Sequence, residues 1–280
     1  MAQRICMVTG ASSGIGKETS RKLAELGATV VLVCRNQKRG EKAMSEIKGA
    51  SNNAEVELLV ADFASLDSVR ALAKEYLKKH DSLHVLVNNV GGVNVTRSLT
   101  ADGFETTFQV DYLSHFLLTN LLLEVLEKSA PSRIINVSSA SHYRGHLNFD
   151  DLQMKKRYGV MKAYSQAKLA QVLFTYELSK RLEGTGVTVN SLHPGAVATN
   201  IWKSPMGPFS FLGNISRLFL LSPERGAETP VYLASSQEVD GATGRYYDHM
   251  REKQSSTESY DRATAEKLWD ESEKLTGLST

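Results

Sequence analysis

Tyr164 and Lys168 are the two residues whose types and spacing most directly suggest chemistry. They lie four positions apart in a stretch whose apolar residues recur at helical spacing, so both side chains should project from one helix face. A free tyrosine ionises near pH ~10, but a neighbouring ammonium favours the phenolate and lowers its pKa. The pair could therefore act as an acid–base catalyst, unless the spacing is a chance feature of an amphipathic helix.

A glycine-rich stretch near the N-terminus follows one apolar run and precedes a helical pattern. Residues 5–8 are expected to form a strand, and Gly10, Gly14 and Gly16 stand between this strand and the next helix. Glycines let the backbone turn tightly and approach a pyrophosphate, whose charge is met by the N–H groups at the helix start. The spacing differs from the commoner Gly-x-Gly-x-x-Gly, but its strand context favours nucleotide binding.

The second expected strand, residues 29–34, is followed by Arg35. In dinucleotide-binding folds a residue near this point reads the ribose 2′ position, and it is an acid for a bare hydroxyl or an arginine for a 2′-phosphate. Arg35 therefore indicates NADP(H) as the cofactor. Lys17, Lys38 and Arg39 could add positive charge nearby, but each is more typical of a solvated helix or loop, so the prediction depends on Arg35.

Strand and helix patterns continue to alternate after this point. Such alternation predicts parallel strands joined by crossover helices, with ligands at the carboxyl ends of the strands. Asp62, Asn88 and Ser139 each stand at such a strand end. The predicted fold class is α/β, a single-domain Rossmann-type doubly wound parallel sheet with helices on both faces over residues 1–280. The remaining expected elements are strands at 56–61, 85–87, 134–137 and 187–190, and helices at about 65–79 and 104–127.

The C-terminal third contains one unusual segment. Residues from about 198 to 221 mix Pro, Gly, Phe and Leu, which we interpret as a mobile apolar lid over the substrate. Ser222 and Pro223 should begin another helix as its N-cap and first helical residue. Residues 244–247 are expected to form a last strand. A charged surface helix at about 263–275 completes a helical tail of about 255–280.

Composition excludes several classes of function. The chain has 280 residues and a formal net charge of +2 without a long Lys/Arg block, so charge gives no case for nucleic acid or an anionic membrane. Cys6 and Cys34 lie in apolar runs, which suits buried thiols in a reducing compartment and predicts a cytoplasmic protein. No stretch is long and apolar enough for a transmembrane segment. His142, His146 and His193 lie in expected loops without a supporting cysteine or carboxylate pattern, so no metal site is predicted.

Five motifs in order resemble those of the short-chain dehydrogenase/reductase superfamily. They are the run at 9–16, Asn88-Asn89-x-Gly91, Ser139, Tyr164-x-x-x-Lys168 and Pro194-Gly195. The closer pattern is similar to the retinol dehydrogenase branch. The residues that carry this closer similarity are Cys34, Arg35, the runs at 100–105 and 115–119, Phe149, the run at 151–153, Arg157 and Tyr158. Light-dependent protochlorophyllide reductases share several of these runs, but the segment before Tyr164 is too short for their extra loop.

The resemblance implies roles for individual residues. Tyr164 would exchange a proton with the substrate oxygen, Lys168 would lower the tyrosine pKa and hold the nicotinamide ribose, and Ser139 would hydrogen-bond the carbonyl or alcohol. Ser139 is preferred to Ser138 because its spacing to Tyr164 matches the retinol dehydrogenase pattern. The implied cofactor contacts are Gly10, Ser12, Ser13, Gly14, Ile15, Gly16, Arg35, Asn36, Asp62, Phe63, Asn89, Gly91, Tyr164, Lys168, Pro194, Gly195, Val197 and Thr199.

Two positions depart from the family pattern. Val90 replaces an alanine after the paired asparagines, and Asp111 replaces an asparagine that belongs to the proton relay. A carboxylate can accept a hydrogen bond from the relay water but cannot donate one, and an ionised Asp111 near Lys168 would raise the pKa of Tyr164. The alternative is that Asp111 is neutral or points away from the site.

The predicted function is an NADP(H)-dependent oxidoreductase. It would transfer a hydride between the nicotinamide and a carbonyl or alcohol of an apolar substrate, such as an aldehyde, a ketone or a retinoid-like molecule, mainly in the reducing direction. One alternative is a catalytically weak or silent NADP(H)-binding regulatory protein, and a second is a protochlorophyllide reductase-like enzyme. Since the family often assembles through its long helices, here about 104–127 and 164–181, a homo-oligomer is also expected.

Overall fold

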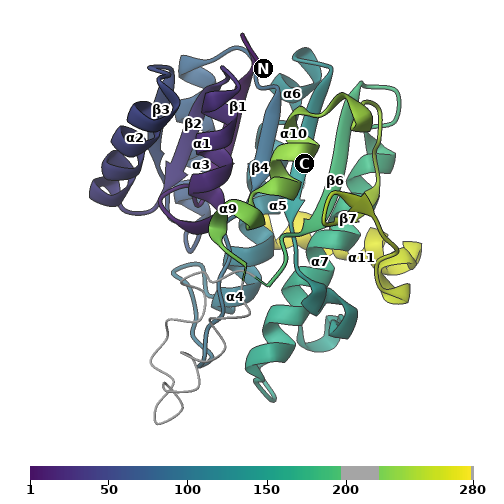
Figure 1. Ribbon diagram of the computed structural model, residues 1–280. Helices are drawn as coiled ribbons and strands as arrows, with labels where there is room; N and C mark the ends of the chain where they lie inside the picture. Colours follow the sequence, from purple (N-terminus) through teal and green to yellow (C-terminus); the bar gives the residue numbers. More distant parts are fainter. Residues whose placement is uncertain (197–220, 279–280) are drawn as a thin grey trace.

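A mostly parallel sheet forms the centre of the molecule. The computed structural model describes residues 1–196 and 221–278, and within them the strand order is β3-β2-β1-β4-β5-β6-β7-β8 (Figure 1). Strands β1 to β7 are parallel, and only β8 at one edge is antiparallel to its neighbour. The strands are β1 (Ile5–Thr9), β2 (Thr29–Cys34), β3 (Val56–Val60), β4 (Val85–Asn88), β5 (Ser132–Val137), β6 (Val187–His193), β7 (Arg245–Asp248) and β8 (Arg251–Glu252).

This strand order confirms the predicted doubly wound α/β fold. From β1 the chain builds outward to β2 and β3, then returns to the other side of β1 with β4. At such a reversal the crossover connections diverge, so the carboxyl ends of β1 and β4 border a ligand-binding crevice. The predicted lid at about 198–221 lies outside the described residues, apart from Leu221.

Apolar residues line both faces of the sheet, as expected for strands buried on both sides. Cys6 and Val8 of β1 belong to one core cluster, whereas Met7 between them belongs to the other. The first cluster is covered by α1 (Gly14–Glu25), α2 (Gln37–Ser51) and α10 (Glu228–Ser235), and α1 also contacts the short α9 (Pro223–Gly226). The second cluster is covered by α3 (Leu66–Lys79), α5 (Ser114–Leu121), α7 (Val160–Arg181) and α11 (Arg262–Thr276). In α9, Ser222 caps the helix and Pro223 is its first residue, as predicted.

The structure has helical segments over most of the stretch predicted as one long helix at about 104–127, but their hydrogen bonding is irregular. It consists of α4 (Thr106–Phe108), a π turn (Gln109–Leu113), α5, and α6 (Leu123–Lys128). In the π turn the amide of Ser114 donates to the carbonyl of Gln109, five residues earlier. A π turn contains an extra residue and is often found at functional sites. The turn buries Asp111 completely. Apolar periodicity predicts a continuous helix here, because it does not report which carbonyl each amide bonds.

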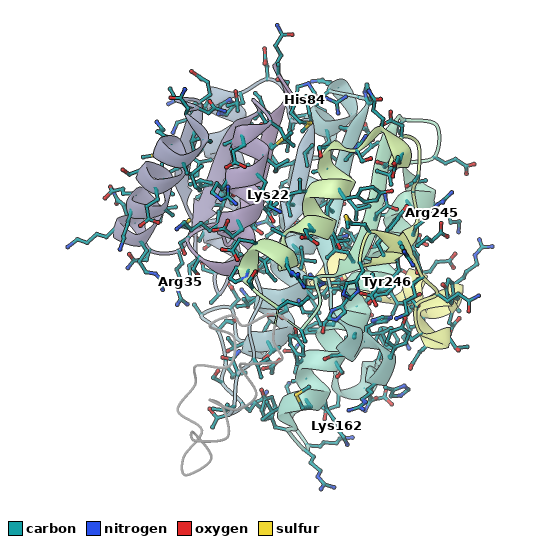
Figure 2. All side chains as sticks on the ribbon, in the orientation of Figure 1. Lys22, Arg35, His84, Lys162, Arg245 and Tyr246 are labelled. Carbon is teal, nitrogen blue, oxygen red and sulfur yellow. The ribbon has the colours of Figure 1, made fainter. Side chains whose placement is uncertain are left out.

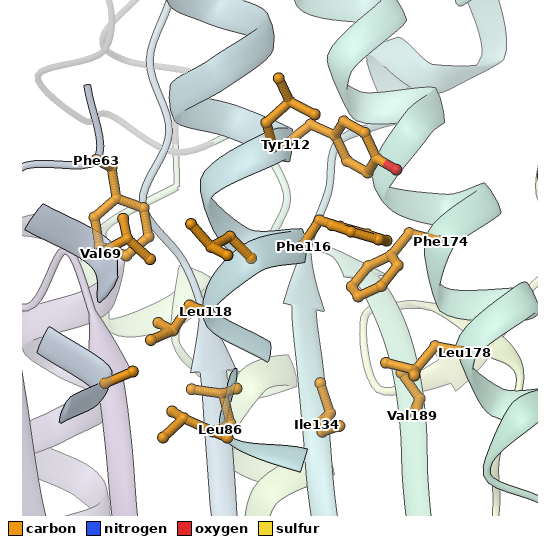
Figure 3. Packing of buried hydrophobic residues seen from close by; sticks show 14 of the residues in the cluster. Phe63, Val69, Leu86, Tyr112, Phe116, Leu118, Ile134, Phe174, Leu178 and Val189 are labelled. Carbon is orange, nitrogen blue, oxygen red and sulfur yellow. The ribbon is translucent and has the colours of Figure 1, made fainter. Parts of the chain in front are cut away.

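The C-terminal helix α11 is more deeply integrated than the predicted charged surface helix. The indole of Trp269 is 5% exposed and lies 5.0 Å from the ring of Phe116 and 5.9 Å from the ring of Phe174, between ring centroids. Figure 3 shows Phe116 and Phe174 meeting between their helices. The hydroxyls of Tyr112 and Ser272 are 2.7 Å apart. Helix α11 therefore completes the core over α5 and α7.

Two further findings concern the described residues alone. No helix in residues 1–196 and 221–278 is long and apolar enough to cross a membrane. Cys6 and Cys34 are both free and buried.

Replacing Trp269 by alanine should strongly destabilise the protein. The change removes a buried indole from a three-ring contact, and large aromatic-to-alanine changes in cores typically cost roughly 3–5 kcal/mol. The free energy of unfolding, measured by urea denaturation, should fall by that amount. Leu77→Ala is the control, because Leu77 is 46% exposed and should change stability by no more than about 0.5 kcal/mol. A small effect of Trp269→Ala would show that α11 is not part of the cooperative core.

Candidate active site

Helix α7 places Tyr164 and Lys168 together at the carboxyl edge of the sheet. Lys168 Nζ lies 5.5 Å from the centroid of the Tyr164 ring. Both residues are buried, with relative exposures of 8% and 3%. Ala163 and Ala167, which alternate with them on α7, are buried as well, so the small side chains let the helix pack closely beside the sheet.

The pKa of Tyr164 is the result of opposing influences. Burial is the largest and raises the pKa, because it penalises the charged phenolate. Lys168 lowers it, Asp111 raises it, and a hydrogen bond from Ser139 lowers it. The net pKa is raised above its usual value. Lys168 therefore acts in the predicted direction, but in the protein alone its effect is outweighed by burial.

The two serines that follow β5 have different surroundings. Ser138 is buried, and its hydroxyl donates to the backbone carbonyl of Lys168 at 2.8 Å. Ser139 is partly exposed and caps a short 3-10 helix, where its Oγ accepts the amide of Ser141 at 3.2 Å. The Ser138 hydroxyl is thus committed to holding α7 against β5. Only the Ser139 hydroxyl has the access that a substrate contact requires.

Asp111 points toward Lys168 and not away from the site. Its Oδ1 accepts the amide of Gly92 at 2.9 Å, and its Oδ2 lies 3.3 Å from Lys168 Nζ. The Oδ2 contact has the distance of an ion pair but lacks the alignment of a hydrogen bond within the described part of the chain. Burial raises the pKa of Asp111 to about 6, against the opposing effects of Lys168 and Gly92.

Gln171 and His115 extend this cluster, and sequence reasoning missed both. Lys168 Nζ donates to Gln171 Oε1 at 2.9 Å, and Gln171 Nε2 donates to His115 Nδ1 at 3.0 Å. The imidazole of His115 is therefore in the tautomer with its proton on Nε2, and burial lowers its pKa to about 3. Gln171 stands three residues after Lys168, so its shared helix face was visible in the sequence. Its partner His115 lies on another helix, so this contact could not be predicted from the sequence.

His142 is a third missed residue, because it was considered only as a metal ligand. It is fully buried, its Nδ1 donates to the carbonyl of Ser139 at 2.7 Å, and its Nε2 accepts the amide of Ser256 at 3.1 Å. Burial lowers its pKa to about 4, which keeps the ring neutral and able to make both bonds. His142 therefore ties the backbone of Ser139 to the segment that follows β8. In residues 1–196 and 221–278, no group of three or more His, Cys, Asp or Glu could hold a metal ion.

The glycine-rich loop has the geometry that a pyrophosphate requires. Gly10 and Gly14 have φ of +69° and +60°, values that side-chain-bearing residues rarely adopt. A Cβ on Gly16 would lie 2.6 Å from the carbonyl oxygen of Gly10. The side chain of Ser13 does not cap α1, and the first turn of α1 has no acidic residue. The first N–H groups of α1 therefore remain free to bind an anion.

A hollow of about 450 Å³ adjoins this loop and is lined by Ser13 and by both basic and acidic residues, the latter being Glu18, Glu46 and Glu224. Lys17, Arg39 and Lys42 contribute to its walls, and Arg39 Nη2 lies 3.5 Å from Ser13 Oγ. Arg35 is exposed immediately after β2, at the edge where the strands end (Figure 2). Arg39 lies in the first turn of α2, shortly after Arg35. The sequence alone did not indicate that its side chain reaches Ser13, so the cofactor prediction depended on Arg35. Lys17 and Lys42 both pair with Glu46, so Arg35 and Arg39 are the cations that best fit a phosphate next to the glycine-rich loop.

Several other predicted cofactor residues have side chains that are committed within the protein. Asn36 Oδ1 accepts the amide of Arg39 and so caps α2, and Asp62 Oδ1 accepts the amide of Ala64. The ring of Phe63 lies in the core, and Asn89 Nδ2 donates to the carbonyl of Thr9. These four residues can face a cofactor through backbone groups or remaining polar atoms.

The remaining predicted contacts lie near the glycine loop or at the end of β6. Ser12 lines the hollow, Ile15 is buried in α1, and Pro194 lines a separate cavity of about 260 Å³. Gly195 has φ of +86°. Val197 and Thr199 lie outside the described residues.

Comparison with known proteins shows extensive similarity. The family model described as "short chain dehydrogenase" matches residues 4–206. Retinol dehydrogenase 13 of Mus musculus is 46% identical over 280 residues, covering 98% of this chain and 84% of that protein. The crystal structure of an uncharacterised protein from Mycobacterium paratuberculosis aligns with a TM-score of 0.81 and 34% identity, covering 99% of this chain and 94% of the other. The Pseudomonas aeruginosa RhlG/NADP active-site complex aligns with a TM-score of 0.71 and 25% identity, covering 89% and 95%.

The charge of Asp111 should be measurable in the ionisation of Tyr164. Asp111→Asn removes an anion that raises the phenol pKa and leaves Lys168 in place, so the pKa of Tyr164 should fall. Carbon NMR of tyrosine-labelled protein across a pH titration would measure it, with Tyr164→Phe identifying the signal. Asp150→Asn provides the control, because Asp150 is an exposed carboxylate in another loop. A Tyr164 pKa that is the same in both variants and in the unaltered protein would contradict this electrostatic account.

Proposed function

The chain belongs to the short-chain dehydrogenase family, and from this premise we propose that it is an NADP(H)-dependent oxidoreductase acting on a carbonyl or alcohol of an apolar substrate. The observation that carries the proposal is the buried pair of Tyr164 and Lys168 beside the accessible hydroxyl of Ser139. In such an arrangement the phenol of Tyr164 can exchange a proton with a substrate oxygen in a site from which water is largely excluded.

Each of these three residues has a distinct role in the proposed mechanism. The hydroxyl of Ser139 donates a hydrogen bond to the substrate oxygen and orients it. Tyr164 donates its proton to that oxygen during reduction and accepts it during oxidation. Lys168 stabilises the phenolate that remains. The bound nicotinamide would supply or accept the hydride.

The preference for NADP(H) is supported by the charges around the glycine-rich loop. A guanidinium can bind a 2′-phosphate through two charge-assisted hydrogen bonds, whereas NAD(H) offers it only a hydroxyl. Arg35 lies at the end of β2, and Arg39 reaches toward Ser13 in the hollow beside the glycine-rich loop. The description of the Pseudomonas aeruginosa RhlG complex also names NADP.

The substrate class is supported by the relatives. Retinol dehydrogenases at 46% and 43% identity suggest an aldehyde, ketone or retinoid-like molecule, processed mainly in the reducing direction. The segment at about 198–221 is proposed as the lid over this substrate. A cytoplasmic location and a homo-oligomer also stay proposals. The free, buried thiols of Cys6 and Cys34 support the first. Against the second, α11 already covers part of α7, one of the two helices expected to form the contact between subunits.

A second candidate function is a catalytically weak NADP(H)-binding regulatory protein. Its support is the raised pKa of Tyr164, because burial and Asp111 both disfavour the phenolate that remains after proton donation and that acts as the base in alcohol oxidation. Cofactor binding would then be the main property of the chain and turnover a minor one.

Turnover assays with NADPH separate these two candidates. We expect NADPH oxidation with one or more members of a panel of aldehydes, ketones and retinoids. In Tyr164→Phe the ring remains but the proton is lost, so kcat should fall by at least the ~10²–10⁴ typical of general acid–base catalysis while NADPH binding is retained. Tight NADPH binding without turnover on any substrate would favour the regulatory protein. Near-normal kcat in Tyr164→Phe would assign the acid to another residue.

Cofactor choice provides an independent prediction. Arg35→Asp should reverse the preference from NADPH to NADH, because a carboxylate repels the 2′-phosphate and accepts a bond from the free hydroxyl. The measurement is the ratio of kcat/KM for the two cofactors. Arg97→Asp is the control, since Arg97 donates to Gln153 in a different loop and should leave that ratio unchanged. If Arg35→Asp also leaves the ratio unchanged, Arg35 does not read the phosphate.

A further inference from the structure

Three protein oxygens surround the ammonium of Lys168. Nζ donates to the carbonyl of Val137 at 3.2 Å and to Gln171 Oε1 at 2.9 Å, and it lies 3.3 Å from Asp111 Oδ2. They come from three elements, namely β5, α7 and the π turn. An ammonium has three N–H groups, of which two donate to Val137 and Gln171, and the Asp111 carboxylate lies at ion-pair distance on a further side of Nζ.

Asp111 differs from the other two neighbours because its charge can change. The peptide carbonyl of Val137 and the amide of Gln171 stay neutral at any pH at which the protein is folded. Asp111 is fully buried, and only its Oδ1 receives a hydrogen bond, from Gly92. A buried carboxylate with one oxygen lacking a hydrogen bond depends on its counter-ion, because an unpaired buried charge is costly.

The backbone of Gly91 closes over this ion pair. A Cβ at position 91 would lie 3.1 Å from both Asp111 Oδ2 and Lys168 Nζ. Gly91 follows the paired asparagines at the end of β4, on the sheet edge that carries the glycine-rich loop. The ion pair therefore lies directly behind a segment expected to face the cofactor.

We propose that Asp111 occupies the side of Lys168 that the nicotinamide ribose requires, so that cofactor binding is coupled to the uptake of a proton by Asp111. This inference rests on the proposed binding of NADP(H). When Lys168 turns to a ribose hydroxyl, Asp111 loses its counter-ion inside the protein. Protonation removes the uncompensated charge, and the resulting carboxylic acid can itself donate a hydrogen bond.

The other titratable groups around Asp111 favour the same outcome. Lys168 on α7 is the cation that faces it, and Tyr164 on the same helix is neutral in this pH range because its pKa is raised. His115 on α5 is also neutral, since burial lowers its pKa to about 3. Glu105, which caps α4, adds negative charge and so raises the pKa of Asp111.

The direction of the pH dependence follows from these charges. In the free protein Asp111 has a pKa of about 6, and in the complex the pKa is higher because Lys168 has been withdrawn. Binding therefore takes up a proton between these two pKa values and none well below pH 6. Through that window the affinity for NADPH falls as the pH rises, by up to about tenfold per pH unit for one coupled proton.

Calorimetric titration of the intact protein with NADPH tests the proposal. Titrations at pH 7 in buffers of different ionisation enthalpy give the number of protons taken up, with an expected value approaching about one. The 2′-phosphate also titrates, near pH ~6 as phosphate monoesters do, and its contribution must be separated. Adenosine 2′-monophosphate supplies that separation, because the 2′-phosphate is its only phosphate group and it has no nicotinamide ribose. Uptake should be larger with NADPH than with this probe.

Variants then assign the proton to its residue. In Asp111→Asn the excess uptake with NADPH should disappear, and the affinity should lose its additional pH dependence. Glu177→Gln is the matched control, because Glu177 is a buried carboxylate further along α7 that pairs with Arg181, and it should retain the excess. Equal uptake with NADPH and the 2′-monophosphate in the unaltered protein would overturn the proposal without any variant. An excess that persists in Asp111→Asn would also overturn it, whereas failure to bind NADPH at all would reject the proposed function with it.

Discussion

The buried ammonium of Lys168 is the group on which the arrangement of this site depends. A charge with 3% exposure is tolerated only where oxygens surround it, and here they come from the end of β5, from α7 itself and from the π turn that carries Asp111. These three elements must meet at one point. Ser138 reinforces the junction, since its hydroxyl bonds the backbone of α7. Satisfying one cation therefore fixes the relative positions of a strand, a helix and a helix irregularity.

The same junction determines the acid–base properties of the site. Tyr164 is close enough to Lys168 to be influenced by it, but burial and the charge of Asp111 act in the opposite direction. The protein without cofactor thus holds its tyrosine in the protonated form, which is the form needed to donate a proton to a carbonyl. Asp111 and Tyr164 both lie close to Lys168, so a change in the charge of Asp111 changes the pKa of the phenol.

Parallel strands explain why the proposed cofactor-binding and catalytic residues share one edge of the sheet. The glycine-rich loop follows β1, Arg35 follows β2, Gly91 follows β4, and Ser139 follows β5. All these strands run in the same direction, so the groups that follow them lie at the same edge of the sheet. Helix α11 packs against α7 through Trp269, whose ring contacts Phe116 and Phe174. The helix that carries Tyr164 is consequently packed against both β6 and α11.

The sequence by itself determined the fold class, the parallel direction of the strands and the helix face that Tyr164 and Lys168 share. These follow from periodicity and from turn and cap residues such as Gly10 and Ser222, which act within about one helical turn or one strand. Only the tertiary structure decided that the helix around Asp111 forms a π turn, that Asp111 faces Lys168, and that α11 is part of the core. Asp111 and Lys168 are far apart in sequence, and no local pattern reports a contact that depends on how two helices pack against one sheet. For the same reason the hydrogen bond from the His142 side chain to the backbone of Ser139 could not be predicted from the sequence.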